Sequence, residues 1–389
     1  MTRLVLAGVS VRALAQAARR DGLDVVAFDA FGDADTREAC ERWQPLPARP
    51  GSPVDGEALA ACLHALVRQD GREWLGWVPG SGFEPRDSGL EAAAEALPLL
   101  GTTPAAVRRV RDPAFFFGVL DARGIEHPPV QLRPVTSRGW LRKDFGGSGG
   151  EHIHAADAPD LPPATGQTYW QQWMAGQPLS LTLIGNGSRA ALLGANRLLC
   201  GTDAAHPWRY TGVIGPLPWP SGRQQTAWQG LADRLVAAFE LRGLCGIDLL
   251  LDGERCLVLE VNARPPASLV LYGRGGGLMQ AHLRACCQGR LPDAAALAAL
   301  RGGLAADAME VGGQAVVHAP RPLRLDPRQL ERLRQDRRTT HDLHDLPSAP
   351  IEVAAWQPVC SVSARAADPD TVARLLSQRH DHILNLLDT

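Results

Sequence analysis

Short apolar runs alternate with helical patterns over the first hundred residues of the chain. Residues 2–8 (TRLVLAG) have the pattern of a buried strand, residues 11–20 that of a helix, and residues 23–32 (LDVVAFDAFG) that of a second strand. Ser10 is placed to cap the helix. A strand, a helix and a strand within such a short span predict a βαβ unit with parallel strands. We therefore expect a small open parallel α/β domain over residues 1–100.

The pattern changes after residues 101–104 (GTTP), which mark a boundary between structural units. Residues 105–123 predict one helix, which Gly124 closes. Further on, apolar runs flank the turn signals Asn186-Gly187 and Asp252-Gly253, which predict two antiparallel hairpins. The class is therefore α/β overall, with α+β character in the middle. The expected units are 1–100, 101–172, 173–295 and 296–389, the last an α/β packing unit.

Composition excludes several broad classes of protein. The 389 residues include 45% hydrophobic and 21% charged residues, which is typical of a globular chain. Forty basic against 42 acidic residues give a net charge of −2, so a nucleic-acid binder that relies on bulk positive charge is not expected. No apolar run approaches the roughly 20 residues of a membrane span, and the N-terminus lacks a signal-peptide pattern. We expect a cytoplasmic protein without a membrane or nucleic-acid partner.

The chain contains a single lysine, Lys143, among its 40 basic residues. Lys143 lies in a predicted strand (WLRKDF), and the glycine-rich run Gly146-Gly147-Ser148-Gly149-Gly150 follows that strand directly. Glycines allow a backbone to approach an anion closely, and successive N–H groups can surround phosphate oxygens. The run alone would be typical of a flexible surface loop, and the Walker spacing is absent because the lysine precedes the glycines. The adjacent lysine favours a phosphate-binding loop.

Three oxygen-bearing side chains surround the second hairpin: Asp248, Glu260 and Asn262. Such groups are the ligands that Mg²⁺ prefers, and Glu260 and Asn262 share one face of their strand. A turn at residues 252–253 would place Asp248 on the opposite face, whereas a turn at 252–254 would bring all three together. Arg264 continues the same alternation, so it would share the face of Glu260 and Asn262. A solvated face of an edge hairpin is the alternative, but the flanking apolar runs favour a metal site.

These pieces, in this order, resemble the ATP-grasp superfamily, whose carboxylate-activating ligases include biotin carboxylase. The resemblance spans about residues 101–295 and rests on LRKDFGGSGG, TYWQQWMAGQPLS and GIDLLLDGERCLVLEVNARP. Together with GVSVRALAQAARRDG, GWVPGSGFE and HLRACCQGRLP, the pattern is similar to a branch of predicted ATP-dependent carboligases. Some members of that branch are linked to tetrahydromethanopterin-type one-carbon metabolism. The resemblance implies an N-terminal open α/β domain, a mobile lid that carries the glycine loop, and an antiparallel-sheet nucleotide and metal domain.

The resemblance also implies a role for each matching residue. Lys143 would hold ATP phosphates under the loop Gly146, Gly147, Ser148, Gly149 and Gly150. The hinge against adenine and ribose would be Gln171, Gln172, Trp173 and Met174. One or two Mg²⁺ ions would bind Asp248, Glu260 and Asn262, while Arg264 would stabilise the transition state that leads to an acyl phosphate. In the superfamily the stretch around Arg209 faces the substrates, so Arg209 would hold an acceptor carboxylate. Independently of the resemblance, residues 81–84 follow a predicted strand of the N-terminal domain, and at its carboxyl end they would line the substrate cleft.

The chain departs from the family pattern at two places. A second lysine, usual before the Pro113 segment, is missing, and Arg108 or Arg111 would replace it unless the contact is absent. The hinge reads Gln171-Gln172 where Gln-Glu is usual, which affects the ribose contact.

Three functions are compatible with these features. The first is an ADP-forming ligase that activates a small-molecule carboxylate with ATP and joins it to an amine, in biosynthesis of a one-carbon-carrier cofactor. The second is a carboxylase that activates bicarbonate. The third is a non-catalytic nucleotide-binding protein, which the two departures favour and the intact Asp248, Glu260, Asn262 and Arg264 oppose. Because members of the superfamily are often dimers, a homodimer is also expected.

Overall fold

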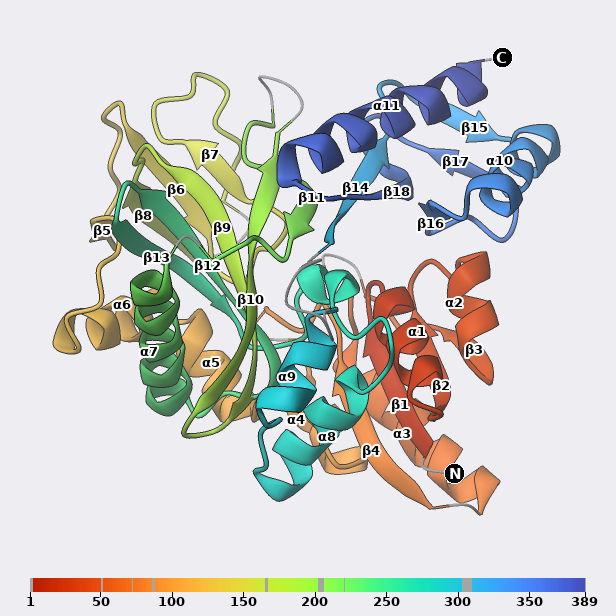
Figure 1. Cartoon of the computed structure of the whole chain (residues 1–389), viewed down its shortest axis with the longest axis horizontal. Coiled ribbons are helices and arrows are strands. Elements are labelled where there is room, and N and C mark those ends of the chain that lie inside the picture. The colour runs from red at the N-terminus through yellow and green to blue at the C-terminus, as the bar shows by residue number, and fades with distance from the viewer. Residues whose placement is uncertain are drawn as a thin grey trace.

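In the computed structural model the chain builds two main sheets and two small ones (Figure 1). The structure describes residues 3–49, 52–71, 73–85, 88–164, 167–201, 206–219, 221–302 and 310–388. No helix in these ranges is both long and apolar enough to cross a membrane.

The N-terminal sheet is parallel, as the sequence predicted, with the strand order β3-β2-β1-β4. Its first strand is buried along its whole length because both faces are covered. Ser10 does not cap the first helix: Val11 occupies that position, and its N–H donates to the Asp29 carboxylate at 2.8 Å. The elements are β1 (Arg3–Gly8), α1 (Arg12–Arg20), β2 (Asp24–Asp29), α2 (Ala34–Ala39), β3 (Arg42–Pro45), α3 (Gly56–Asp70), β4 (Trp74–Pro79) and α4 (Leu90–Ala96).

The single helix expected over 105–123 is two helices, α5 (Pro104–Arg111) and α6 (Pro113–Ala122). Pro113 explains the difference, because proline has no N–H and disfavours a helical conformation in the residue before it. Asp112 is accordingly extended, and its side chain accepts a hydrogen bond from the N–H of Phe115 at 3.1 Å. The break turns the end of α5, and with it Arg111, toward the glycine loop.

The large sheet has eight strands in the order β13-β12-β9-β10-β11-β14-β18-β16. Both predicted hairpins are present, β9–β10 and β12–β13. The sheet continues across the expected boundary at residues 295–296, since β14, β16 and β18 extend the strands of the middle region. The strands are β9 (Gln177–Asn186), β10 (Ala190–Cys200), β11 (Tyr210–Gly215), β12 (Arg242–Asp252), β13 (Arg255–Asn262), β14 (Val311–His318), β16 (Leu343–His344) and β18 (Pro358–Ala366).

A small antiparallel sheet, β5-β8-β6-β7, stands beside the large one and carries Lys143 and the expected hinge. Its strands are β5 (Val130–Gln131), β6 (Trp140–Asp144), β7 (Ile153–Ala155) and β8 (Thr168–Gln172). The remaining elements are α7 (Gly222–Phe239), η1 (Ala267–Leu271), α8 (Leu278–Gln288), α9 (Ala294–Leu300), β15 (Leu323–Leu325), α10 (Pro327–Thr340), β17 (Ile351–Val353) and α11 (Pro369–Asp388).

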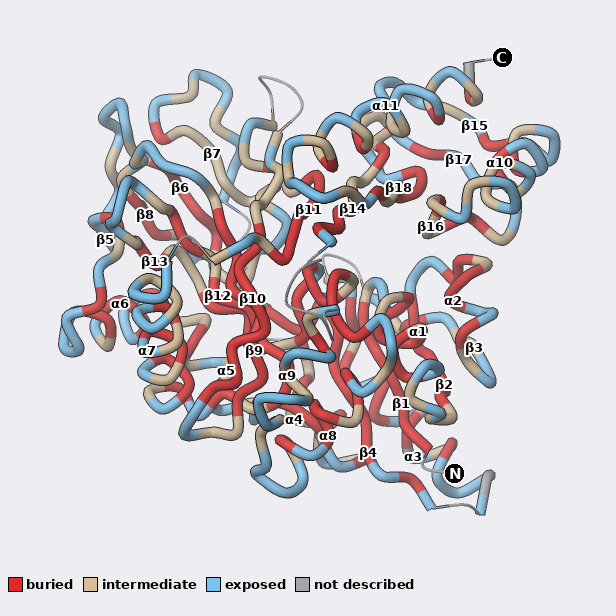
Figure 2. The backbone as a smooth tube through the Cα atoms, viewed as in Figure 1, coloured by how far each residue is buried: buried red, intermediate tan, exposed pale blue. Residues whose placement is uncertain are grey.

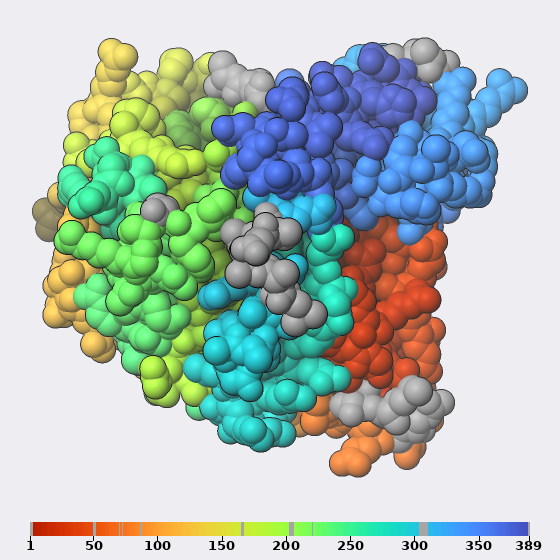
Figure 3. Space-filling model, in the orientation of Figure 1, coloured from red at the N-terminus to blue at the C-terminus, as the bar shows by residue number. Residues whose placement is uncertain are grey.

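Buried side chains join these units into continuous cores (Figure 2). One face of β9 and β10 packs against α7, and the other face shares a core with β1, α1 and α8. The C-terminal elements abut the N-terminal ones (Figure 3), where the N–H of Ala34 donates to the carbonyl of Leu346 at 2.8 Å. The cavity described below lies between all of these units.

We expect Phe239→Ala to destabilise the protein by about 3–5 kcal/mol, the range found for large aromatic truncations in cores. Phe239 is fully buried at the end of α7 and stacks on Phe116 with ring centroids 5.3 Å apart. Denaturant unfolding measures the loss. Phe115→Ala is the matched control, since this ring also contacts Phe239 but is 43% exposed. Equal losses in the two variants would contradict the assignment of this core.

Candidate functional site

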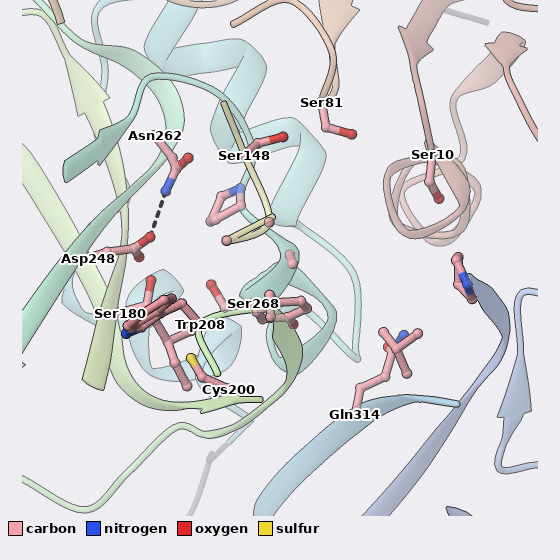
Figure 4. A pocket seen from close by; sticks show the side chains of 18 of the residues that line it. Ser10, Ser81, Ser148, Ser180, Cys200, Trp208, Asp248, Asn262, Ser268 and Gln314 are labelled. Atoms are coloured by element: carbon pink, nitrogen blue, oxygen red, sulfur yellow. Dashed lines mark hydrogen bonds between the residues drawn. The ribbon is translucent and has the colours of Figure 1, made fainter. Parts of the chain in front are cut away.

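A cavity of about 1200 Å³ lies where the N-terminal sheet, the small sheet and the large sheet meet. Asp248 and Asn262 stand on one side of it, and Ser10 and Gln314 stand on the other (Figure 4). Of the fifteen site residues predicted from the sequence, twelve line this cavity. They are Lys143, Ser148, Gly149, Gly150, Gln171, Gln172, Trp173, Met174, Asp248, Glu260, Asn262 and Arg264.

The single lysine is buried in the cavity wall. Strand β6 carries Lys143, whose exposed fraction is 5%, and no described residue forms a hydrogen bond or ion pair with its ammonium group. Burial lowers the pKa of Lys143, and the charges of Glu260 and Asp248 oppose that shift. An enclosed ammonium group without a direct partner is costly, so this position suits a ligand that brings an anion.

The glycine loop is held against two other parts of the chain. The carbonyl of Gly149 accepts a hydrogen bond from the N–H of Tyr210 at 2.9 Å. Gly150 has a positive φ of 80°, and a Cβ atom there would lie 1.9 Å from the carbonyl oxygen of Trp208. Gly146 and Gly147 do not line the main cavity; they border a small adjacent one with Arg111 and Glu260. Only Ser148 to Gly150 therefore face the large cavity.

The expected hinge lies at the end of β8. Gln171 is buried, and nothing in the described part of the chain accepts a hydrogen bond from its Nε2. Trp173 is 53% exposed and lines the cavity together with Met174. A free amide donor beside exposed apolar surface is a suitable setting for a heteroaromatic ring with polar edges.

The two carboxylates of the second hairpin lie directly opposite each other, Asp248 on β12 and Glu260 on β13. The turn has two residues, Gly253 and Glu254, so neither turn considered from the sequence is the observed one. A β-bulge at Leu259 shifts the register and brings Glu260 onto the face of Asp248. Asn262 Nδ2 donates to Asp248 Oδ2 at 3.0 Å (Figure 4), so the three side chains form one group.

This group is electrostatically strained without a bound cation. Burial, and then the charge of Glu260, raises the pKa of Asp248 to about 7, although hydrogen bonds from Ser180 and Asn262 oppose the shift. Burial would also raise the pKa of Glu260, but Arg111, Lys143 and His152 lower it below the ordinary value. Two neighbouring carboxylates and an amide oxygen are the donor set of a hard divalent cation, so the group fits Mg²⁺.

Arg264 is positioned by a buried partner. Its Nε donates to Glu84 Oε1 at 2.6 Å, and Glu84 also accepts from the N–H of Gly82 at 2.6 Å. Burial would raise the pKa of Glu84, but Arg264 and Arg111 lower it, so the carboxylate is ionised. The segment 81–84 thus reaches the cavity from the N-terminal sheet and fixes the guanidinium beside it.

Arg111, one of two residues considered as replacements for the missing lysine, is near the carboxylates: its Nη1 is 4.0 Å from Glu260 Oε2. Arg108 instead pairs with Glu91 on the surface.

The structure does not place Arg209 with the other predicted residues. Its Nε is 3.4 Å from Glu151 Oε1, and its Nη1 donates to the carbonyl of Trp356 at 3.3 Å. Its neighbours Trp208 and Tyr210 line the cavity in its place. This arrangement gives no support to the predicted contact between Arg209 and a substrate carboxylate.

Sequence reasoning missed His152 and Ser180, which also line the cavity. Burial lowers the pKa of His152 to about 4, so the ring is neutral beside Glu260. Ser180 hydrogen-bonds Asp248 from the neighbouring strand β9. His152 lies two residues after the glycine loop, so its place in the site could have been predicted from the sequence. The place of Ser180 could not, because it depends on the pairing of β9 with β12.

Comparisons with known proteins show a domain match and a shared fold. Residues 112–268 match the family model of the ATP-grasp domain. No curated protein sequence matches the chain. Among solved structures, carboxyaminoimidazole ribonucleotide synthase from Aspergillus clavatus complexed with ATP is similar over 99% of both chains, at 14% identity and a TM-score of 0.68.

L-amino acid ligase from Bacillus licheniformis is similar over 98% of this chain and 97% of its own, at 16% identity and a TM-score of 0.67. The biotin carboxylase domain of Hydrogenobacter thermophilus 2-oxoglutarate carboxylase, in complex with MgADP, ADP and bicarbonate, is also similar. The match covers 97% of this chain and 89% of its own, at 12% identity and a TM-score of 0.68. Identities this low establish a shared fold. Residues 112–268 therefore match an ATP-grasp domain, and the chain shares its fold along its whole length with these solved structures.

Proposed function

We propose that the protein is an ADP-forming ligase that activates a small-molecule carboxylate with ATP and joins it to an amine. The observation that carries this proposal is the position of Lys143, buried without a direct partner between the glycine loop and the Asp248–Glu260 pair. The lysine needs an anion, and the carboxylates need a cation. A nucleoside triphosphate with Mg²⁺ supplies both at once.

Each group of residues in the cavity would have its own role. Lys143 and the backbone N–H groups of 148–150 would bind phosphate oxygens, while Gln171 and Trp173 would contact the base. Asp248, Glu260 and Asn262 would hold the cation, which when bound neutralises phosphate charge. Arg264, held by Glu84, would stabilise charge on the transferring phosphoryl group.

The reaction itself needs little more than positioning. A carboxylate oxygen of the substrate attacks the γ-phosphorus, the bond to the β-phosphate oxygen breaks, and ADP leaves. The amine then attacks the acyl carbon, the C–O bond to phosphate breaks, and the amine loses a proton. Because water competes with the amine, the enclosing loop and Trp208 also support the proposal.

The cavity has room for an organic substrate beside the phosphates, as the activated acid or as the acceptor. Beyond Asp248 the cavity extends to Ser10 and Gln314, farther than a bicarbonate ion beside the phosphates requires. The place in one-carbon-carrier biosynthesis rests on the sequence resemblance alone.

The test is release of ADP and phosphate from MgATP with a panel of carboxylic acids, bicarbonate included, and hydroxylamine as the acceptor. Hydroxamate formed from one organic acid supports the ligase and identifies its donor. ADP release that requires bicarbonate, without hydroxamate from any organic acid, would contradict it in favour of a carboxylase. Tight MgATP binding without turnover on any acid would favour the non-catalytic alternative.

We expect Lys143→Ala to reduce ATP turnover about a hundredfold or more, the loss typical when a group that stabilises transition-state charge is removed. Steady-state ADP release measures the effect. Lys143→Arg keeps the charge but not the compact ammonium, so it should recover only part of the activity. Near-normal turnover in the alanine variant, with an unchanged melting temperature, would remove the phosphate role from Lys143.

The metal assignment predicts that MgCl₂ raises the melting temperature of the wild type and not that of Asp248→Asn or Glu260→Gln. Each variant removes one anionic ligand. Asp248→Asn also removes the repulsion between the two carboxylates, so it should be at least as stable as the wild type without Mg²⁺. Glu260→Gln leaves Arg111 and Lys143 without their counter-charge, so it should be less stable. Asp252→Asn, at the exposed end of β12, is the control and should respond like the wild type. An equal Mg²⁺ response in all four proteins would exclude this site.

The glycine loop offers a matched pair of substitutions. Gly149 and Gly150 both have positive φ, but a Cβ atom at Gly149 would meet nothing within 4 Å, whereas one at Gly150 would meet the Trp208 carbonyl. Gly150→Ala should therefore weaken ATP binding about tenfold relative to Gly149→Ala, as overpacking displaces the loop. Calorimetric titration with a non-hydrolysable ATP analogue measures both. Equal affinities would show that the contact with Trp208 does not shape the nucleotide site.

A further inference from the structure

One wall of the cavity contains a buried carboxylate without a partner. Asp33 lies between β2 and α2, has an exposed fraction of 6%, and lines the cavity. Its side chain does not cap α2 and forms no hydrogen bond or ion pair with any residue that the structure describes. A buried carboxylate in this condition is costly unless a ligand pairs with it.

The neighbouring charges leave Asp33 unpaired because they are already bound to one another. Arg12 donates to Asp345 at 2.5 Å and lies 3.7 Å from Asp35. Asp29 accepts backbone hydrogen bonds from Val11, Phe31 and Gly32.

Two further basic groups lie nearby, but neither supplies a free charge. Burial lowers the pKa of His344 to about 4, so its ring is neutral, and Arg337 pairs with Glu38. Negative charge therefore exceeds positive charge in this part of the wall. Burial, followed by the charges of Asp345, Asp35 and Asp29, raises the pKa of Asp33 to about 8, so the group is largely protonated at neutral pH until a bound cation favours the ionised form.

Asp33 belongs to the wall across the cavity from the carboxylate pair that would hold Mg²⁺. The segment after β2 runs beside the β1–α1 turn, since the N–H of Ala30 donates to the carbonyl of Val9 at 3.2 Å. Ser10, in that turn, lies on the opposite side of the cavity from Asp248 (Figure 4). Phe31 is 52% exposed and lines the same region, so apolar surface adjoins the carboxylate.

We propose that Asp33 and Phe31 form a subsite for an ammonium group on an apolar stem, carried by one of the two substrates. This inference rests on the proposed ligase function, because it assigns a substrate class to the same cavity. A metal ion is not the occupant: Asp33 is a single free carboxylate, and the described residues hold no cluster of three or more His, Cys, Asp or Glu side chains suited to a metal. The ammonium would belong either to a second amine of the acceptor or to an amino group of the acid.

The first experiment measures binding without ATP, so that its result does not depend on turnover. Calorimetric titration of the full chain compares pentylamine with 1-pentanol, which has the same stem and no charge. We expect pentylamine to bind about tenfold tighter or more, the effect of one charge-assisted hydrogen bond. Equal binding of the two probes by the wild type would overturn the proposal, and this comparison needs no variant.

Asp33→Asn should abolish the preference for pentylamine, and Asp33→Glu should keep most of it. Asp157→Asn, an exposed position outside the cavity, is the control and should bind like the wild type. A folded Asp33→Asn protein that keeps the full preference would show that the cation binds elsewhere, which also overturns the proposal.

Turnover with matched pairs then identifies which substrate carries the ammonium. A higher ADP release with 1,5-diaminopentane than with pentylamine assigns it to the acceptor, and a higher release with 5-aminopentanoate than with pentanoate assigns it to the acid. Selective pentylamine binding without turnover on any pair supports the subsite and contradicts the ligase. Turnover without a preference for pentylamine in binding supports the ligase and contradicts the subsite.

Discussion

The contact between Asp248 and Glu260 is the constraint on which the rest of the site depends. Two carboxylates face each other across neighbouring strands, where like charges destabilise a sheet. The surroundings compensate from several directions: Asn262 and Ser180 donate to Asp248, while the charges of Arg111 and Lys143 act on Glu260. Each of these groups comes from a different element, so the charge pair ties together the large sheet, the small sheet and α5.

The N-terminal sheet completes the site through a second buried charge. Glu84 reaches across from the segment after β4 and fixes Arg264, which follows β13. Arg12 and Asp345 make a comparable link between α1 and the segment after β16. The cavity is thus closed by ion pairs between units, and ion pairs of this kind need both partners, because a single remaining charge would be buried and uncompensated.

Local patterns in the sequence were sufficient to predict many of the elements and twelve of the residues that line the cavity. The βαβ unit, both hairpins, the lysine with its glycine loop and the group of Asp248, Glu260 and Asn262 all follow from spacing and residue type. The break at Pro113 was also readable, because a proline preceded by an aspartate ends one helix and begins another. In contrast, the bulge at Leu259 leaves no mark on the hydrophobic pattern, although it decides which face Glu260 occupies.

Features that depend on distant parts of the chain could not be predicted. Arg209 had the right chemistry and position in the sequence, but Glu151 and the Trp356 carbonyl bind it outside the cavity. Asp33 could not be predicted, since its importance depends on its having no partner among the described residues once Arg12 is bound by Asp345 and Asp35. Which buried charges are paired depends on contacts between distant segments, so it can be determined only from the folded structure.

The most direct test of the account follows the oxygen atoms. The donor acid is supplied with ¹⁸O in its carboxylate, together with MgATP and hydroxylamine, and the released phosphate is analysed by mass spectrometry. Activation as an acyl phosphate predicts one ¹⁸O atom per phosphate formed, because the carboxylate oxygen leaves with the phosphoryl group. Phosphate without ¹⁸O, formed in step with the product, would contradict the account, since the carboxylate would then not have attacked the γ-phosphorus.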